Sequence, residues 1–202
     1  MARILRAGLI GLGMMGRHHA RNLRALDGVD LVAVADSFGD PHGVAQGLDV
    51  LPDVESLIAA GIDYAVVAVP TQFHRDVALT LAEAGVHCMV EKPLAFDIAE
   101  AEEIAAAYDS AGLIGAVGYI ERYNPALQEM RRRIRDGQLG EIYQVITRRQ
   151  GAFPARIRDV GVVKDLATHD LDLTAWVAGS SFASVSAAST RRSGRELSLI
   201  HI

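Results

Sequence analysis

The chain has 202 residues, half of them hydrophobic, with 22% charged residues and a formal net charge of −5 at pH 7. These values exclude a disordered or collagen-like chain and indicate one large domain, or one domain plus part of a second. The mild acidity argues against nucleic acid as the main partner, because phosphate binding needs a concentrated basic face.

The first part of the chain alternates short apolar segments with longer helical patterns. In chain order, strands are expected at Ile4–Ile10, Leu31–Ala35, Tyr64–Val69, His87–Val90 and Ile114–Tyr119, and helices at Met14–Leu26, Phe73–Ala84 and Asp97–Ala111. Asp97 is placed to cap the last of these helices. Because the strands are continuously apolar, the alternation predicts a doubly wound parallel sheet, a Rossmann α/β domain over residues 1–120.

The pattern changes after a boundary that we place near Tyr119–Asn124. Helices are expected at Pro125–Asp136 and Asp165–Ala178, and strands with one exposed face at Glu141–Gln150 and Phe182–Thr190. Such strands belong to open antiparallel or mixed sheets. Residues 121–196 therefore predict an α+β domain, which we expect to be incomplete because two or three strands are too few to bury a sheet face.

The last six residues, Leu197–Ile202, read LSLIHI. This is the translation of CTG TCT CTT ATA CAC ATC, which we identify as a transposon end used in sequencing-library preparation. We therefore interpret residues 197–202 as a non-native tail and expect the native residues to stop near Glu196. A genuine short apolar tail is the alternative.

Two features bear on the compartment. The single cysteine, Cys88, lies in an apolar stretch, where we interpret it as a buried side chain and not as a catalytic thiol. Met1–Gly8 enters a predicted strand at once, without the hydrophobic region of a signal peptide, and the apolar runs are too short to cross a bilayer. We therefore expect a cytoplasmic protein.

A glycine pattern follows the first predicted strand and opens the first predicted helix: Gly11-Leu12-Gly13-Met14-Met15-Gly16 fits G-x-G-x-x-G. Gly11 can make the tight turn, Gly13 lets the backbone approach a pyrophosphate, and Gly16 lets helix and strand pack closely. The free N–H groups and the dipole at the helix start then favour negative charge. The pattern predicts a dinucleotide-binding turn.

Asp36 ends the next predicted strand, twenty residues after Gly16. A carboxylate at this position can accept hydrogen bonds from the adenosine ribose, and it would repel the 2′-phosphate of NADP. The sequence therefore favours NAD as the cofactor. His18 and His19, early in the first helix, are interpreted as packing or surface residues.

Glu91-Lys92-Pro93 follows the strand at His87–Val90, at the edge of a parallel sheet where ligands bind. A lysine held there would face the nicotinamide end of the cofactor, although a surface Glu–Lys pair is the alternative.

An ordered set of short motifs extends over most of the chain and resembles the glucose–fructose oxidoreductase/inositol dehydrogenase/MocA family. The motifs are the glycine turn, Asp36, Val69-Pro70-Thr71 with His74, Glu91-Lys92-Pro93, Tyr123-Asn124-Pro125 and Asp165–Asp172. The resemblance implies hydride transfer between NAD(P) and a sugar or polyol, and a second domain whose open sheet mediates homo-oligomerisation. It implies cofactor binding by Gly11, Gly13, Met14, Met15, Gly16, Asp36, Pro70, Thr71, His74, Glu91 and Lys92.

The segment Asp165–Asp172 looks like the family's D-x-G-x-H-x-x-D pattern, with Ala167 in place of glycine. Asp165 and His169 are four residues apart and share a helix face. The resemblance implies a catalytic group in which His169 takes the hydroxyl proton, Lys92 holds the oxygen and Asp165 tunes one or both. Metal ligation by Asp165, His169 and Asp172 is the alternative; we expect no metal.

Gly118–Pro125 and Asp159–Leu166 resemble the nucleotide-sugar branch, and are similar to UDP-N-acetylglucosamine 3-dehydrogenases. Arg122, Arg156 and Arg158 could meet a diphosphate, because guanidinium groups suit phosphate oxygens. The implied substrate contacts are Lys92, Tyr123, Asn124, Arg156, Arg158, Asp165 and His169. Tyr123 and Asn124 are equally compatible with a helix start capped by Asn124.

Two other functions stay open. An inositol or free-sugar dehydrogenase would fit the same family resemblance. A non-catalytic NAD-binding sensor could use the same fold, because fold does not fix function. The presence of both Lys92 and His169 favours an enzyme acting on a small-molecule sugar or nucleotide sugar, with no nucleic-acid or membrane partner.

Overall fold

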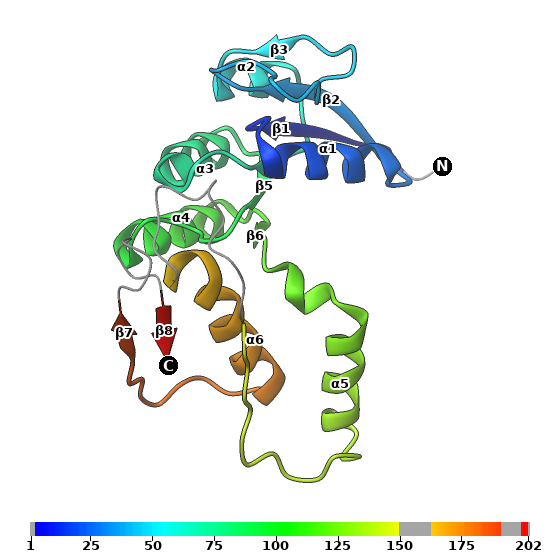
Figure 1. Cartoon of the computed structure of the whole chain (residues 1–202). Helices are drawn as coiled ribbons and strands as arrows, with labels where there is room; N and C mark the ends of the chain where they lie inside the picture. Colours follow the sequence, from blue (N-terminus) through cyan, green and yellow to red (C-terminus); the bar gives the residue numbers. More distant parts are fainter. Residues whose placement is uncertain (1–2, 150–162, 191–198, 202) are drawn as a thin grey trace. The chain divides into compact units, whose positions relative to one another are not determined.

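The computed structural model describes residues 3–149, 163–190 and 199–201 (Figure 1). The chain divides into two compact units, Met1–Gly118 and Tyr119–Ile202. Within the described residues, no helix combines the length and the apolar character needed to span a bilayer.

The first unit is built on a six-stranded sheet in which every neighbouring pair is parallel. Its strands are β1 (Leu5–Ile10), β2 (Val29–Ala35), β3 (Val50–Leu51), β4 (Tyr64–Val67), β5 (His87–Val90) and β6 (Gly115–Val117). They lie in the order β3-β2-β1-β4-β5-β6, so the strand order reverses between β1 and β4. This is the Rossmann order, and the predicted fold class is confirmed.

Helices cover both faces of this sheet (Figure 1). They are α1 (Met14–Ala25), α2 (Val54–Ala59), α3 (His74–Glu83, preceded by the 3₁₀ turn η1, Thr71–Phe73) and α4 (Ile98–Ala111). Leu57 and Leu81 bring α2 and α3 into one hydrophobic cluster, whereas Leu23 brings α1 into the other. Leu9 and Ile10 of β1 enter opposite clusters, as expected when successive side chains of a strand alternate between faces.

Local signals explain how some helices begin. The carboxylate of Asp97 accepts a hydrogen bond from the Glu100 N–H, which confirms the predicted cap of α4. Asp53 caps α2 in the same way through Ser56. Neither α2 nor β3 was predicted, because six-residue and two-residue elements are too short to show a clear hydrophobic period.

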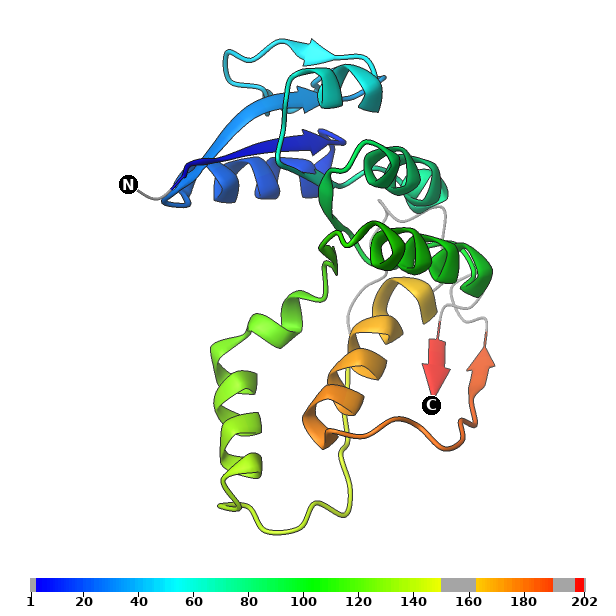
Figure 2. The same cartoon turned by 180° about the vertical axis from the view of Figure 1, so that it is seen from behind.

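The second unit contains the 3₁₀ turn η2 (Ile120–Tyr123), α5 (Pro125–Arg135), a π-helical turn η3 (Val163–Ala167), α6 (Thr168–Ala178), β7 (Ala188–Thr190) and β8 (Leu199–His201). The two predicted helices are confirmed. The Arg131 guanidinium lies 4.3 Å from the centroid of the Trp176 ring, so a cation–π contact joins α5 to α6 within this unit. Figure 2 shows the two helices, α5 in light green and α6 in gold.

The two strands predicted in the second unit are largely wrong. Residues 141–149 form no strand and are exposed, and the segment predicted at Phe182–Thr190 is a strand only over Ala188–Thr190. An alternating pattern supplies one apolar face, but a strand also needs a neighbour for its N–H and C=O groups. The short β7 has such a neighbour in β8, which pairs with it in antiparallel orientation.

Leu81 lies in α3 and is fully buried in the larger hydrophobic cluster. We expect Leu81→Ala to lower the free energy of unfolding by about 2–5 kcal/mol, because it leaves a cavity in a packed core. Urea unfolding followed by far-UV circular dichroism measures this. Ile98→Ala is the control, since Ile98 is 76% exposed. Equal losses in the two variants would contradict the assignment of Leu81 to the core.

Candidate functional site

The glycine turn between β1 and α1 is shaped by close backbone contacts. Gly11 has φ +94°, and a Cβ there would lie 2.5 Å from the Ala68 carbonyl carbon. A Cβ on Gly16 would lie 1.9 Å from the Gly11 carbonyl oxygen, so only glycine lets α1 start this close to the turn. A Cβ on Gly13, in contrast, would meet nothing within 4 Å.

The start of α1 suits an anion. Its N-cap residue is Gly13, no side chain caps it, and its first turn carries no acidic residue. The first N–H groups of the helix therefore lack a side-chain acceptor, and the helix dipole favours negative charge beside them. Met14 is 42% exposed and Met15 is half-buried in this turn. These residues fit the pyrophosphate of a dinucleotide.

Asp36 follows β2 and ties the end of that strand to the glycine turn. One carboxylate oxygen accepts the Leu12 N–H at 2.7 Å, and the other accepts the Phe38 N–H at 2.8 Å. Each carboxylate oxygen can accept a second hydrogen bond. Asp36 is thus fixed in place with acceptor capacity left for ribose hydroxyls.

His74 links the turns that follow β4 and β5. Its side chain is 1% exposed. Nδ1 lies 2.9 Å from the Pro93 carbonyl oxygen and 3.3 Å from that of Leu94, and Nε2 lies 2.9 Å from the Val69 carbonyl oxygen. Both ring nitrogens face backbone acceptors, so His74 has no ring nitrogen turned toward a ligand. Pro70, which is exposed, and Thr71, which is buried, lie in the same turn.

Glu91 and Lys92 follow β5, and the Lys92–Pro93 bond is cis. Glu91 is buried and its carboxylate lies 2.7 Å from Nε2 of His19, while the Lys92 N–H donates to its other oxygen at 3.2 Å. Burial alone would raise the pKa of Glu91, but the hydrogen bonds and charges of His19 and Lys92 together outweigh it, so this pKa is lowered from its ordinary value. Glu91 thereby joins the Lys92 turn to the helix that starts at the glycine turn.

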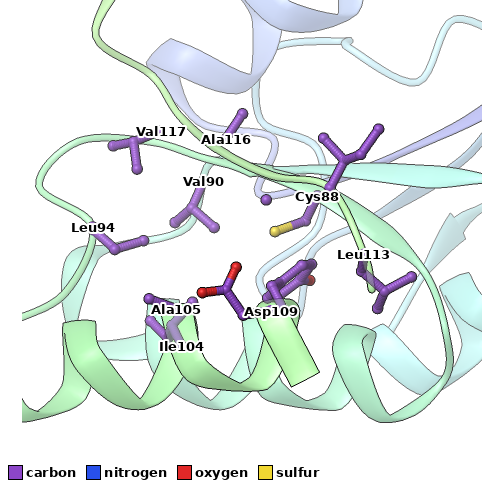
Figure 3. Close-up of a pocket in the computed structure, with 12 residues that line it drawn as sticks. Cys88, Val90, Leu94, Ile104, Ala105, Asp109, Leu113, Ala116 and Val117 are labelled. Carbon is purple, nitrogen blue, oxygen red and sulfur yellow. The ribbon is translucent and has the colours of Figure 1, made fainter. Parts of the chain in front are cut away.

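A cavity of about 300 Å³ lies between β5, β6 and α4 in the first unit (Figure 3). Its lining is mainly apolar and includes Cys88, Val90, Ile104 and Tyr108, but none of the residues predicted to be catalytic. Burial raises the pKa of the Cys88 thiol, despite a hydrogen bond with Tyr108 that lowers it. A thiol with a raised pKa is a poor nucleophile, which agrees with the interpretation of Cys88 as a packing residue.

The second unit carries the other predicted catalytic residues. Asp165 is buried in the π-helical turn η3, and His169 lies in the first turn of α6 with its Nδ1 atom below the surface. Four residues correspond to slightly less than one turn of a π-helix or slightly more than one turn of an α-helix, so the two side chains lie on about the same side of this continuous helical segment. Ala167, two positions after Asp165 in the chain, is also buried. Such π-helical turns are frequent at functional sites.

Ion pairs occupy several charged residues of the second unit. Arg122 makes a bidentate ion pair with Asp172, with Nε 2.8 Å from one carboxylate oxygen. Arg149 bridges Glu121 at 3.1 Å and Asp170 at 3.0 Å. The suggestion that Arg122 meets a diphosphate therefore has to account for a guanidinium already paired with Asp172. Arg156 and Arg158 lie outside the described residues.

Tyr123 is 75% exposed, and Asn124 caps α5 by accepting the Ala126 N–H at 3.1 Å, with Pro125 as the first residue of the helix. The capping role suggested by the sequence is thus present. Among the residues that the structure describes, no group of three or more His, Cys, Asp or Glu side chains could hold a metal ion.

Sequence reasoning missed His19 and Arg149. His19 was interpreted as a packing or surface residue, yet it is the partner of a buried carboxylate. Its partner Glu91 is 72 positions away, and no local pattern reports a contact at that separation. Arg149 was not singled out, because a lone arginine in an irregular segment carries no motif.

Two profiles of one protein family match the chain. Residues 5–119 match the profile described as an oxidoreductase family with an NAD-binding Rossmann fold (GFO/IDH/MocA). Residues 127–198 match the profile of the GFO/IDH/MocA C-terminal domain. The first match alone covers more than half of the chain.

Individual relatives share this similarity. The chain is 34% identical over 196 residues to the scyllo-inositol 2-dehydrogenase (NAD(+)) of Bacillus subtilis, covering 92% of this chain and 57% of that protein. It is 34% identical over 179 residues to the UDP-N-acetylglucosamine 3-dehydrogenase of Acidithiobacillus ferrooxidans, covering 87% of this chain and 55% of that protein. The chain therefore spans little more than half the length of these curated relatives.

A solved structure extends the comparison. The UDP-N-acetylglucosamine 3-dehydrogenase GnnA from Acidithiobacillus ferrooxidans superposes with a TM-score of 0.81 at 32% sequence identity, covering 96% of this chain and 62% of that one. The fold similarity therefore extends through both units.

Gly13 and Gly16 have different expected roles, Gly13 in binding NAD and Gly16 in folding as well. We expect Gly13→Ala to leave the unfolding free energy within about 1 kcal/mol and to weaken NAD binding at least about ten-fold, or 1.4 kcal/mol, because its methyl group enters open space where the pyrophosphate would lie. Gly16→Ala should weaken both, since its Cβ collides with a backbone oxygen. Titration calorimetry and urea unfolding measure the two effects. Unchanged NAD affinity in Gly13→Ala would contradict the assigned position of the pyrophosphate.

The buried Glu91–His19 pair predicts a pH dependence of stability. The folded-state pKa of Glu91 is lowered, so its stabilising contribution is present above the unfolded-state pKa and is lost as pH falls through the folded-state value. We expect Glu91→Gln to lower the unfolding free energy by about 1–3 kcal/mol at pH 7, with the difference shrinking below about pH 4. Urea unfolding at several pH values tests this, with the exposed Glu102→Gln as the control. A difference that stays constant down to low pH would show that the carboxylate charge does not matter.

Proposed function

We propose that the whole protein is an NAD-dependent dehydrogenase that oxidises a hydroxyl group of a sugar or polyol. The chain belongs to the GFO/IDH/MocA oxidoreductase family. The observation that carries the proposal is the glycine turn, where the open side of Gly13 and the uncapped start of α1 fit a pyrophosphate. Asp36 supports NAD over NADP, because a fixed carboxylate would repel a 2′-phosphate.

The reaction divides into two transfers. A bound NAD would supply the hydride acceptor for oxidation of the carbon that bears the hydroxyl. The hydroxyl must also lose its proton, and we assign that proton to His169, whose ring Asp165 would orient or polarise. Lys92 would hold the substrate oxygen and stabilise the negative charge that develops on it. A base of this kind supplies typically about 10²–10⁴-fold of the rate.

For the substrate, we propose a UDP-N-acetylhexosamine oxidised at its 3-hydroxyl. The similarity to a UDP-N-acetylglucosamine 3-dehydrogenase supports this choice, as does the resemblance of Gly118–Pro125 to that branch. An inositol is the second candidate, since an inositol dehydrogenase has the same identity to this chain. The two substrates differ in a diphosphate, which would need cationic partners in the protein.

The whole protein, incubated with NAD and either UDP-N-acetylglucosamine or an inositol, should reduce NAD with the first substrate at the higher kcat/KM. Absorbance of NADH follows the reaction. A preference for the inositol would refute the nucleotide-sugar assignment but not the dehydrogenase, whereas no turnover with any sugar or polyol would refute both.

Variants of the whole protein test the assigned roles. Lys92→Ala and His169→Ala should each lower kcat by about 10²-fold or more and leave the affinity for NAD within about two-fold, because neither side chain is assigned to the pyrophosphate or ribose. Arg21→Ala and His42→Ala are matched controls at exposed positions. Normal turnover in Lys92→Ala or His169→Ala would remove that residue from the mechanism.

A further inference from the structure

Both ring nitrogens of His74 face hydrogen-bond acceptors, and a neutral imidazole can donate to only one of them. A neutral ring has one N–H donor and one bare nitrogen. Here both nitrogens face carbonyl oxygens at 2.9 Å, those of Pro93 and Val69. Carbonyl oxygens only accept hydrogen bonds, so in either neutral tautomer one lone pair would point at another. Two donated hydrogen bonds require a proton on each nitrogen.

The two hydrogen bonds of the His74 ring connect two turns at the same edge of the sheet. Val69 lies in the turn after β4, and Pro93 directly follows Lys92 in the turn after β5. Parallel strands bring both turns to the same edge of the sheet, and β4 and β5 are neighbours. A single ring therefore joins the backbone of the turn after β4 to the backbone of the turn after β5, which contains Lys92.

The turn that contains Lys92 is also held by α1, the helix that follows the glycine turn. His19 of α1 contacts the buried carboxylate of Glu91, which accepts the Lys92 N–H. A Cβ on Gly118 would lie 3.2 Å from the same carboxylate, so the backbone after β6 packs closely against it. With Glu91 fixed on one side of Lys92 and the Pro93 carbonyl held by His74 on the other, the lysine backbone has little freedom.

We propose that His74 is a doubly protonated imidazolium that positions Lys92 by donating hydrogen bonds to the Val69 and Pro93 carbonyls. This proposal rests on the catalytic role proposed for Lys92. The hydrogen-bond acceptors of the ring are backbone carbonyls of the turns after β4 and β5, so His74 is a positioning residue. The dipole of α3 disfavours a cation at the helix start, but three carbonyl oxygens within 3.3 Å of Nδ1 and Nε2 stabilise it.

A second histidine of the same sheet provides an internal reference. Nδ1 of His87 accepts the Ile114 N–H at 3.0 Å. A nitrogen that accepts a hydrogen bond must be bare, so the contact of His87 leaves only Nε2 to carry a proton. The chain thus offers one histidine whose contacts require two protons and one whose contacts allow a proton on a single nitrogen.

Nitrogen NMR of the 202-residue chain labelled with ¹⁵N-histidine tests the proton count. The spectrum is recorded at about pH 7.5, above the ordinary histidine pKa of about 6.5, and His74→Gln assigns the His74 signals. We expect two protonated ring nitrogens for His74 and a bare Nδ1 for His87. A bare nitrogen at His74 would overturn the proposal. This result does not depend on turnover, so it is independent of the proposed function.

The positioning role is tested in the whole protein with His74→Leu, which has no donors, and His74→Gln, which restores one donor group. We expect His74→Leu to lower kcat about 10–100-fold with the KM for NAD within about two-fold, and to speed amide exchange in residues 91–95 but not in β2. His74→Gln should recover part of kcat. His42→Leu, at an exposed position, is the control.

The outcomes separate the two proposals. Normal kcat in His74→Leu, with Lys92→Ala inactive, would refute the positioning role and leave the dehydrogenase intact. Faster exchange spread over the whole first unit would also refute it, because His74 would then be a general stabilising residue. Normal turnover in Lys92→Ala would refute the function while the NMR result for His74 stands.

Discussion

The candidate site residues of the first unit come together because all six strands of its sheet run in the same direction. Gly11, Asp36, Val69 and Glu91 each follow a different strand, yet the carboxyl ends of parallel strands meet at one edge. The strand order reverses between β1 and β4, where this fold binds its ligand. The parallel direction of the strands therefore brings these residues to one edge of the sheet, and local hydrogen bonds then fix the conformation of each turn.

Most of those polar contacts are partly buried, so the hydrogen bonds made by each ionisable group are set against the cost of removing it from water. A hydrogen bond to a charged group contributes about 1.5–3 kcal/mol, and a cation at a helix start costs about 0.3–1 kcal/mol. In the arrangement proposed above, the hydrogen bonds donated by an imidazolium at His74 would act against that dipole cost and against desolvation of the ring. A neutral ring would avoid desolvation of a charge. However, the lone pair of its bare nitrogen would then point at a lone pair of a carbonyl oxygen 2.9 Å away. Glu91 shows the same balance from the acidic side, since contact with His19 lowers a pKa that burial would raise.

The parts predicted from the sequence were those with a local cause. The strands predicted at His87–Val90 and Ile4–Ile10 were indicated by mostly apolar local segments, and the caps formed by Asp97 and Asn124 depend on residues a few positions away. Contacts between distant positions were not predictable, and the His19–Glu91 pair is an example. The strand expected at Glu141–Gln150 failed for a related reason, because its alternating pattern says nothing about whether another strand lies beside it.

The ion pair between Arg122 and Asp172 affects the interpretation of Arg122 as a contact for a diphosphate. The Arg122 guanidinium is engaged with Asp172 through two nitrogens, so it joins the turn before α5 to the helix that carries His169. A guanidinium has five N–H donors, and two of them serve this pair. Arg122 can thus fix the geometry of α6 and still offer donors to an anion.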